Sequence, residues 1–180
     1  MTRHLHPVYP YLLRDLAIVR HNQALCTDIT NIPIRRSFLY LMAIMHWHSR
    51  RVPLCRLSNM MGLVGCRQAL RETSAQHGTP KIFNTNQGSQ FTSLAFTQML
   101  VDADMRICMD GRGRWMDNVV IERVWRSLKY ECVDLHAFEM GLALYAGLRR
   151  SIRHHNTRPP YSSLAGGTPE AAYNERGSTP

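Results

Sequence analysis

The first third of the chain has the apolar pattern of three neighbouring β-strands. Residues typical of strands occupy 26–32, 38–47 and 51–57, with turn-forming residues between these runs. The middle run is almost continuously apolar and aromatic, which is typical of a central strand buried on both faces. Pro33 is expected to end the first strand, and a tight turn at 48–50 joins the second strand to the third. Strands this close in sequence predict an antiparallel meander.

Helix-like and strand-like segments alternate over the rest of the chain. The predicted order is helix 62–77, strand 81–84, helix 93–103, strand 106–109, a Gly-rich loop at 110–116, and helices from 117 to about 130 and from about 137 to 155. We therefore expect an α/β fold in which helices flank a mixed sheet of five strands.

The chain divides into three parts in this interpretation. Residues 1–24 form a lead-in segment, residues 25–156 form the core, and residues 157–180 form a tail rich in Pro, Gly and Ser. Within the tail, a short capping turn is expected at 168–173. A length of 180 residues is enough for one domain with a sizeable core.

Composition and charge indicate a folded protein with a polyanionic partner. Apolar residues make up 44% of the chain and charged residues 19%, which excludes a disordered class. Lys and Arg outnumber Asp and Glu by 22 to 13, a formal charge of +9 that favours phosphate contacts. Arginines crowd the C-terminal half at Arg112, Arg114, Arg123, Arg126, Arg149, Arg150, Arg153 and Arg158.

Other classes of protein are disfavoured by what the sequence lacks. The longest apolar run, 38–45, is too short to span a bilayer, and the N-terminus has no signal-peptide pattern, so a cytoplasmic location without membrane contact is expected. The five cysteines are odd in number and never form Cys-x-x-Cys, which argues against a zinc finger and a disulfide framework. Small buried thiols are the simpler interpretation.

Three blocks of polar residues carry candidate chemistry. Asp28 lies inside the first predicted strand, where a carboxylate is costly unless it is paired or binds a metal. The second block follows the strand at 81–84 and includes Asn86 and Gly88 in a polar turn. In the third, Glu122, Arg126 and Lys129 share one face of a helix. The opposite arc holds Ile121, Val124, Trp125 and Leu128.

Each block also has an ordinary structural interpretation. Asp28 alone could be a hydrogen-bonded residue at a strand end, and the segment around Asn86 could be a capped turn. The third block could be a surface helix with a solvated pair between Glu122 and Arg126.

Taken together, the three blocks resemble a known family. Residues 27–30, 84–93 and 116–131 look like the catalytic core of bacterial insertion-sequence transposases, the DDE type with a retroviral-integrase-like, ribonuclease-H-like domain. The 35 residues between Asn86 and Glu122 match the family's spacing between its second and third acidic residues. Further similarity covers 110–115, 155–160 and 167–171, so the resemblance extends over nearly the whole chain from about residue 9.

The resemblance implies roles for specific residues. Asp28, position 86 and Glu122 would be the catalytic and metal-binding positions, holding Mg²⁺ or Mn²⁺ in a two-metal site that cleaves phosphodiesters and transfers strands during DNA transposition and integration. DNA contacts would come from Lys129, Arg126, Arg123, Arg114 and Arg112. The implied partners are the transposon ends and target DNA, further copies of the chain, and a separate helix-turn-helix subunit.

Two positions and one region depart from the family pattern. Asn86 stands where the family has its second Asp, and its amide brings no negative charge to a metal site. His46 stands where similar proteins usually have an acidic residue. It is expected to be a core histidine rather than a metal ligand. The upstream helix-turn-helix region of similar transposases has no counterpart here.

These observations leave three hypotheses. The chain is a transposase core impaired by Asn86, or an inactive, truncated transposase that only binds DNA or an intact transposase, or a remnant without a role. A ribonuclease-H-like nuclease of another kind is disfavoured, because the similarity extends beyond the acidic positions.

Overall fold

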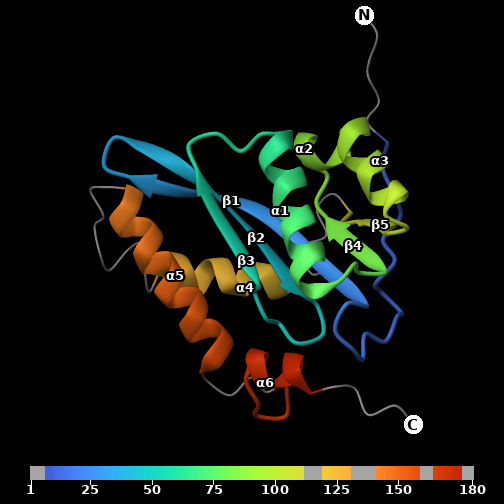
Figure 1. Cartoon of the computed structure of the whole chain (residues 1–180). Helices are drawn as coiled ribbons and strands as arrows, with labels where there is room; N and C mark the ends of the chain where they lie inside the picture. The colour runs from blue at the N-terminus through green and yellow to red at the C-terminus, as the bar shows by residue number, and fades with distance from the viewer. Residues whose placement is uncertain (1–6, 112–118, 131–140, 159–163, 176–180) are drawn as a thin grey trace, which may run out of the picture.

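A single mixed sheet organises the chain in the computed structural model, which describes residues 7–111, 119–130, 141–158 and 164–175. The strands are β1 (Ala24–Ile34), β2 (Ser37–His46), β3 (Leu54–Ser58), β4 (Ile82–Thr85) and β5 (Arg106–Met109), in the order β3-β2-β1-β4-β5 (Figure 1). β1, β2 and β3 are antiparallel, while β4 is parallel to both β1 and β5. The predicted meander and the five-stranded mixed sheet are therefore confirmed.

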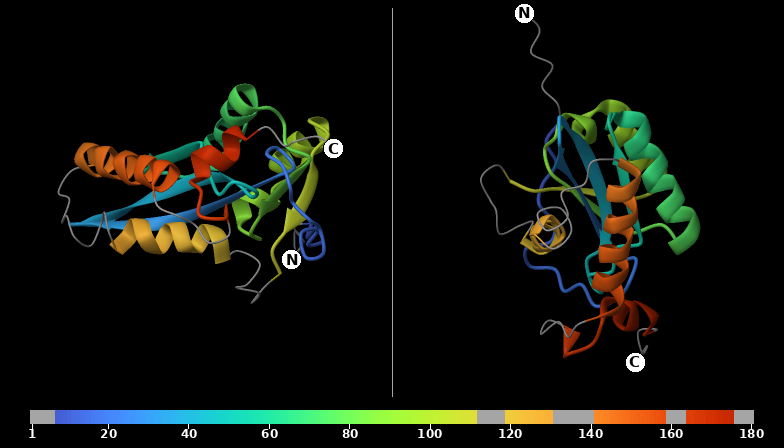
Figure 2. Two further views of the ribbon diagram at one scale, coloured as in Figure 1. Left: turned by 90° about the horizontal axis from the view of Figure 1, so that it is seen from below. Right: turned by 90° about the vertical axis from the view of Figure 1, so that its left-hand side faces the viewer.

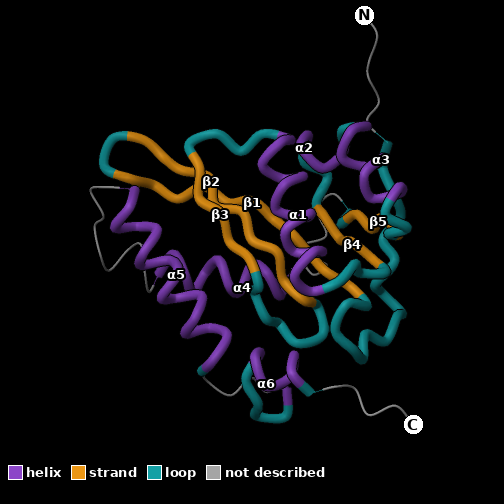
Figure 3. The backbone as a smooth tube through the Cα atoms, viewed as in Figure 1, coloured by secondary structure: helices purple, strands orange, loops and turns teal. Residues whose placement is uncertain are grey.

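Helices flank this sheet, as the sequence predicted (Figure 3). They are α1 (Leu63–His77), α2 (Ser89–Thr92), α3 (Leu94–Asp102), α4 (Val119–Leu128), α5 (Gly141–Thr157) and α6 (Pro169–Asn174). α1 ends at Gly78, whose φ of 88° is accessible to glycine without strain. Residues 112–118 and 137–140 of the predicted loop and helices lie outside the described residues.

Apolar residues alternate along the central strands and so build a core on each face of the sheet. On one face, Leu25 and Met42 pack with residues of α1 and α3. On the other, Cys26 and Ala43 pack with residues of α4 and α5. Figure 2 shows α1 and α4 on opposite sides of the sheet.

Two predicted strand boundaries and one predicted turn differ from the structure. β1 continues through Pro33. β4 pairs with β1 only as far as Cys26, so the rest of β1 has no β4 partner along that edge, and a proline is tolerated there. β3 begins at Leu54 rather than residue 51, because the side chain of Asn156 takes the backbone N–H and C=O of Val52. The turn expected at 168–173 is the helix α6, capped by Thr168.

The helix predicted at 93–103 is confirmed as α3, which is preceded by one further short helix. Ser93 has extended backbone angles, and its hydroxyl oxygen accepts from the N–H of Phe96 at the start of α3. The preceding turn is the short helix α2, which the sequence did not reveal.

The described part of the lead-in segment lies along the outer edge of β5. Met109 donates its N–H to the carbonyl of Pro10, and Leu13 packs with Ala24 and Cys108. The proposed division at residues 24 and 156 stays a prediction.

Two minor expectations concern the cysteines and the membrane. Cys26, Cys66 and Cys108 are buried and Cys55 is half-buried, and none of these four takes part in a disulfide. No helix among the described residues combines the length and apolar character needed to cross a membrane.

Candidate functional site

The sheet register brings Asp28 and Asn86 together. β1 and β4 are parallel, with Cys26 opposite Asn84. Asp28 lies two residues after Cys26 in β1, and Asn86 lies two residues after Asn84, directly beyond the end of β4. Asp28 shares its parity with Cys26 and therefore faces α4. The structure thus places two of the predicted site residues in direct contact.

The amide of Asn86 is held by two hydrogen bonds with opposite roles. Its Nδ2 donates to Oδ1 of Asp28 at 2.7 Å, and its Oδ1 accepts the backbone N–H of Gly88 at 2.8 Å. Rotating the amide by half a turn would bring two acceptors together at Asp28 and two donors together at Gly88. The hydrogen bonds therefore fix the N–H of Asn86, not its carbonyl, toward the carboxylate.

Gly88 is required for this close approach. A Cβ at this position would lie 2.8 Å from Oδ1 of Asn86, closer than side-chain atoms pack. The glycine that sequence reasoning placed in a polar turn therefore admits the Asn86 side chain.

α4 supplies the second partner of Asp28. Ile121, Val124, Trp125 and Leu128 are buried, whereas Glu122 and Arg126 are exposed, which confirms the amphipathic pattern predicted for this helix. The indole N–H of Trp125 donates to Oδ2 of Asp28 at 2.9 Å. Trp125 was assigned only to the apolar arc. Its spacing of three residues from Glu122 was the available signal that it could reach the site.

Burial raises the pKa of the Asp28 carboxyl above its ordinary value. The hydrogen bonds from Trp125, the backbone of Ile29 and Asn86 act in the opposite direction, and the negative charge of Glu122 raises the pKa further. Glu122 is therefore close enough to Asp28 for their charges to interact, so the described structure brings all three predicted positions to one region.

Replacing Trp125 by phenylalanine is expected to raise the pKa of Asp28 further, because the carboxylate loses a donor. Since the folded pKa is raised, the Asp28 contribution to stability is present at low pH and is lost as pH rises through the folded pKa. In Trp125→Phe, the pH range over which this contribution is lost should extend to higher pH. A carboxyl NMR titration measures the pKa of Asp28, with Trp47→Phe as the control. An unchanged Asp28 pKa in Trp125→Phe would contradict the assigned role of the indole.

The donor set does not fit two divalent cations. Such ions need oxygen ligands and negative charge, but the site offers the carboxylates of Asp28 and Glu122 and an amide N–H. Asn86 could turn its oxygen toward Asp28 only by breaking both of its hydrogen bonds. No group of three His, Cys, Asp or Glu suited to a metal occurs within the described part of the chain.

The predicted DNA-binding residues are only partly described. Arg123 and Arg126 are exposed on α4, and Lys129 is half-buried just beyond it. Both Glu122 and Arg126 are described, and no ion pair joins them, contrary to the surface-helix interpretation. Arg112 and Arg114 lie outside the described residues.

His46 is a core histidine, as expected, but its hydrogen bonds are not satisfied: neither ring nitrogen has a partner among the described residues. It is fully buried, and its ring packs on Tyr173 at 4.8 Å and His77 at 5.9 Å between ring centroids. Burial, with the nearby His77, lowers the pKa of His46 to about 3. His46 lies three residues along β2 from Ala43, the partner of Asp28, and takes no part in the Asp28 cluster.

Sequence reasoning missed a buried carboxylate beside the site. Asp110 follows β5 and accepts from Nδ2 of Asn84 at 2.9 Å, and its backbone carbonyl accepts from Gln87. Its position directly after a strand, next to the residues following β4, was the available signal. These bonds brace the turn that carries Asn86.

Curated proteins similar to this chain are transposases of bacterial insertion sequences. The InsK protein of element IS150 from Escherichia coli (strain K12) is 27% identical over 162 residues, 88% of this chain and 56% of the relative. The transposase of IS904 from Lactococcus lactis subsp. lactis (strain IL1403) is 27% identical over 146 residues, which cover 79% of this chain and 58% of the relative. The chain thus spans about half the length of these curated relatives.

Solved structures that resemble this chain include an intasome and an integrase catalytic core domain. A chain of the simian T-cell lymphotropic virus intasome, in complex with PP2A regulatory subunit B56 gamma, matches 97% of this chain and 62% of its own length, with a TM-score of 0.75 and 17% identity. The HTLV-2 integrase catalytic core domain in complex with magnesium matches 87% of this chain and 99% of its own length, with a TM-score of 0.64 and 15% identity. These likenesses show the ribonuclease-H-like fold of an integrase catalytic core.

The family itself is identified by sequence. The integrase core domain family matches residues 19–114, more than half of the chain, and a second match of the same description covers residues 103–169. The two matches together include β1, β4 and α4, the elements that carry Asp28, Asn86 and Glu122. The chain belongs to the integrase core domain family.

Proposed function

We propose that this chain is the integrase-like core of an insertion-sequence transposase that binds DNA but is strongly impaired in cleavage and strand transfer. Family membership and the insertion-sequence relatives support the transposase assignment. The formal charge of +9 supports a nucleic-acid partner. The observation that carries the impairment is the N–H of Asn86 directed at Asp28.

Impairment follows from the charge at the site. Two divalent cations carry four positive charges, and a site with Asp28 and Glu122 supplies two negative ones, where the family pattern supplies three. Mg²⁺ or Mn²⁺ would supply charge neutralisation at the reacting phosphate if it bound. Because the amide takes the place of a charged ligand, we infer that metal binding is weak and that catalysis falls severely.

Partners follow from the same assignment. We propose transposon ends and target DNA as the nucleic-acid substrates, with recognition of the ends assisted by a helix-turn-helix region or subunit. Assembly of several copies is supported by the fold, since HTLV-2 integrase cores have been solved in dimeric and trimeric forms. The alternative, an inactive chain that binds only DNA or an intact transposase, is favoured by the same Asn86 contact.

We propose that the DNA-binding face lies on α4. Arg123 and Arg126 are exposed there, beside Glu122 and close to Lys129. Arginine and lysine on one helix next to the site would hold a phosphodiester backbone in place by phosphate contacts without reading its sequence.

Replacing Arg126 and Lys129 by alanine is expected to weaken binding of a short duplex on the order of 10-fold at about 0.1 M salt. The slope of log K against log salt should become shallower by about 0.9 for each phosphate that the variant no longer neutralises. Fluorescence anisotropy measures both quantities, with Lys81→Ala, an exposed cation at the start of β4, as the control. Equal slopes for the double variant and the control would remove α4 from the interface.

The impairment is tested with supercoiled plasmid, which requires no particular terminal repeat. The unmodified chain is expected to bind the plasmid but to nick it no faster than an Asp28→Ala variant in Mg²⁺ or Mn²⁺. Metal-dependent nicking that Asp28→Ala abolishes would refute the impairment while leaving the DNA-binding assignment intact.

A further inference from the structure

The turn between β2 and β3 holds Arg50 in an unusual backbone conformation. Its φ of 63° lies in the left-handed region, where a residue other than glycine is strained. The N–H of Arg50 donates to the carbonyl of His46 at 2.9 Å, and its own carbonyl accepts from Nε2 of His155 at 2.8 Å. Contacts on both sides therefore keep Arg50 in this conformation. Strain that is maintained in this way is typical of functional positions.

The guanidinium of Arg50 has no counter-charge within the described part of the chain. The side chain is half-buried, its Nη1 is shielded from water without a hydrogen-bond partner, and the ion pairs of the described residues do not include it. Burial raises the pKa of the nearby Cys26 thiol, and the charges of Asp110 and Asp28 add to this effect. Neither carboxylate shifts the pKa of Arg50. A cation held partly out of water without an anion is costly, so this arrangement indicates an anionic ligand.

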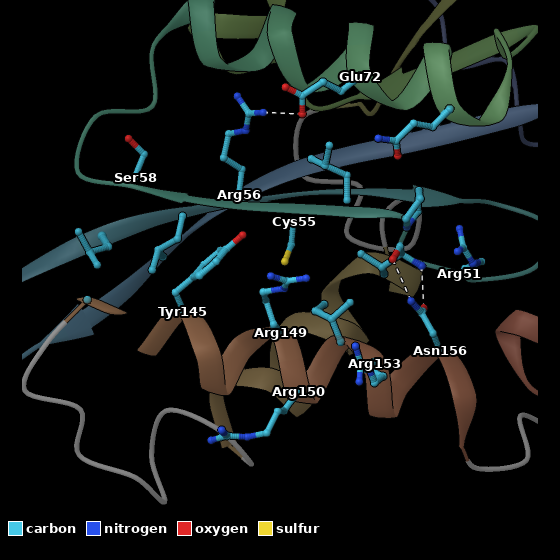
Figure 4. A pocket seen from close by; sticks show the side chains of 18 of the residues that line it. Arg51, Cys55, Arg56, Ser58, Glu72, Tyr145, Arg149, Arg150, Arg153 and Asn156 are labelled. Atoms are coloured by element: carbon cyan, nitrogen blue, oxygen red, sulfur yellow. Dashed lines mark hydrogen bonds and ion pairs between the residues drawn. The ribbon is translucent and has the colours of Figure 1, made fainter. Parts of the chain in front are cut away.

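Other arginines close to this turn are either paired or hydrated. Arg51 pairs with Glu170 at 2.6 Å, and Arg56 pairs with Glu72 at 2.7 Å. Both pairs line a hollow of about 1410 Å³ beside β3, between α1 and α5 (Figure 4). The arginines of α5 that line the same hollow have no acidic partner among the described residues, but they are exposed to water. Arg50 is neither paired with an acid nor fully exposed.

The groups that contact the Arg50 guanidinium or act on its charge do not balance it. Its central carbon lies 5.4 Å from the ring centroid of Trp47, which supports it without neutralising it. Burial lowers the pKa of Arg50, the Cys26 thiol acts in the opposite direction, and the positive charge of Arg123 lowers the pKa further. The Cys26 thiol is itself neutral, since its pKa is raised. Arg50 and Arg123 are therefore close enough for their positive charges to repel each other.

Arg123 links this turn to α4. It is exposed on that helix, directly after Glu122 in the sequence. An anion that contacts both Arg50 and Arg123 would remove their repulsion and supply the counter-charge that Arg50 lacks. Guanidinium groups match the oxygens of a phosphate particularly well, because their N–H groups form a planar fork.

We propose that Arg50 and Arg123 together bind a phosphate of the DNA backbone, so that the DNA-binding face extends from α4 to the turn between β2 and β3. The contact holds the DNA in place by charge and reads no sequence. The inference rests on the proposed function, because DNA bound at α4 supplies the phosphate. It adds Arg50, a residue from a different part of the chain, to the arginines and lysine of α4.

Replacing Arg50 by methionine tests the proposal, because methionine keeps an apolar stem against Trp47 and removes the charge. Duplex binding should weaken about 5-fold at about 0.1 M salt, and the slope of log K against log salt should become shallower by about 0.9. Arg50→Lys, which keeps the charge, should restore the slope. Arg106→Met removes the same charge at the exposed start of β5 and should leave the slope unchanged. The Tm of Arg50→Met should rise by about 2 °C, because a desolvated charge without a partner is removed.

The outcomes separate this proposal from the proposed function. A lower Tm with an unchanged salt slope in Arg50→Met would make Arg50 a structural residue and overturn the proposal. If Arg126→Ala/Lys129→Ala weakens duplex binding and Arg50→Met does not, the Arg50 proposal alone fails. A chain that binds no duplex would overturn both.

NMR identifies the source of the phosphate. The Nε–H signal of Arg50, assigned by its loss in Arg50→Met, should shift saturably with duplex and stay unchanged with inorganic phosphate at the same phosphate concentration. A shift with inorganic phosphate but not with duplex would overturn DNA as the ligand.

Discussion

Replacing Asn86 by aspartate is expected to make both the stability and the nicking activity of the chain depend on divalent cations. Without metal, the new carboxylate lies against Asp28, where the amide nitrogen now donates at 2.7 Å. Two carboxylates at this distance cannot both ionise freely, so the variant should lose about 2 kcal/mol of stability, or about 4–8 °C in Tm for a domain of this size. With three carboxylates, Mg²⁺ should restore that stability, since saturation at about 100 times Kd contributes about 2.7 kcal/mol.

Nicking of supercoiled plasmid should rise at least about 100-fold over the unmodified chain, because a missing ligand is restored to the metal site. Asn86→Ala is the control: like Asn86→Asp it loses the donor to Asp28, and it also loses the acceptor for the Gly88 N–H, but it adds no charge. Mg²⁺ should therefore neither stabilise it nor restore its nicking activity. The explanation fails if Asn86→Asp and Asn86→Ala respond equally to Mg²⁺.

Replacing Asn156 by alanine is expected to destabilise the fold by about 3 kcal/mol. Val52 is 1% exposed, and its N–H and C=O both rely on Asn156. Alanine leaves two buried backbone groups without partners, each costing about 1–3 kcal/mol. Thermal unfolding should show a Tm lower by about 6–12 °C.

Thr157→Ala provides the control in the adjacent position. Thr157 is exposed, and among the described residues its hydroxyl bonds only to the Arg153 carbonyl of its own helix, so its removal should cost less than about 0.5 kcal/mol. If the two variants had equal stability, the Asn156 hydrogen bonds would contribute little to the fold.

The sheet could be predicted because its order follows from local patterns. Alternating or continuous apolar runs identify β1 and β2, and the short loop at 48–50 implies that β2 and β3 are antiparallel. The parallel placement of β4 next to β1 also brings Asn86, which directly follows β4, into contact with Asp28 inside β1.

The direction of the hydrogen bonds in the site could not be predicted. Residue spacing identified Asn86 as a neutral replacement, but not that its N–H rather than its oxygen faces Asp28. That orientation depends on Gly88, whose missing Cβ makes room for the amide. The Trp125 indole reaches Asp28 only because α4 packs across β1, which helix periodicity alone does not determine.

Long-range side-chain pairings escaped the sequence for the same reason. Asn156 and Val52 are 104 residues apart, and nothing in either local pattern links them. The arginine-lined hollow beside β3 likewise arises only when α1 and α5 pack on either side of a terminal strand.

The most direct test of the Asn86 assignment is a Mn²⁺ titration of the unmodified chain by isothermal calorimetry, repeated with Asp28→Ala. We expect no saturable heat attributable to Asp28 below about 1 mM Mn²⁺, because the amide N–H holds the carboxylate in a metal-free arrangement. Binding in the micromolar range that Asp28→Ala abolishes would contradict this account.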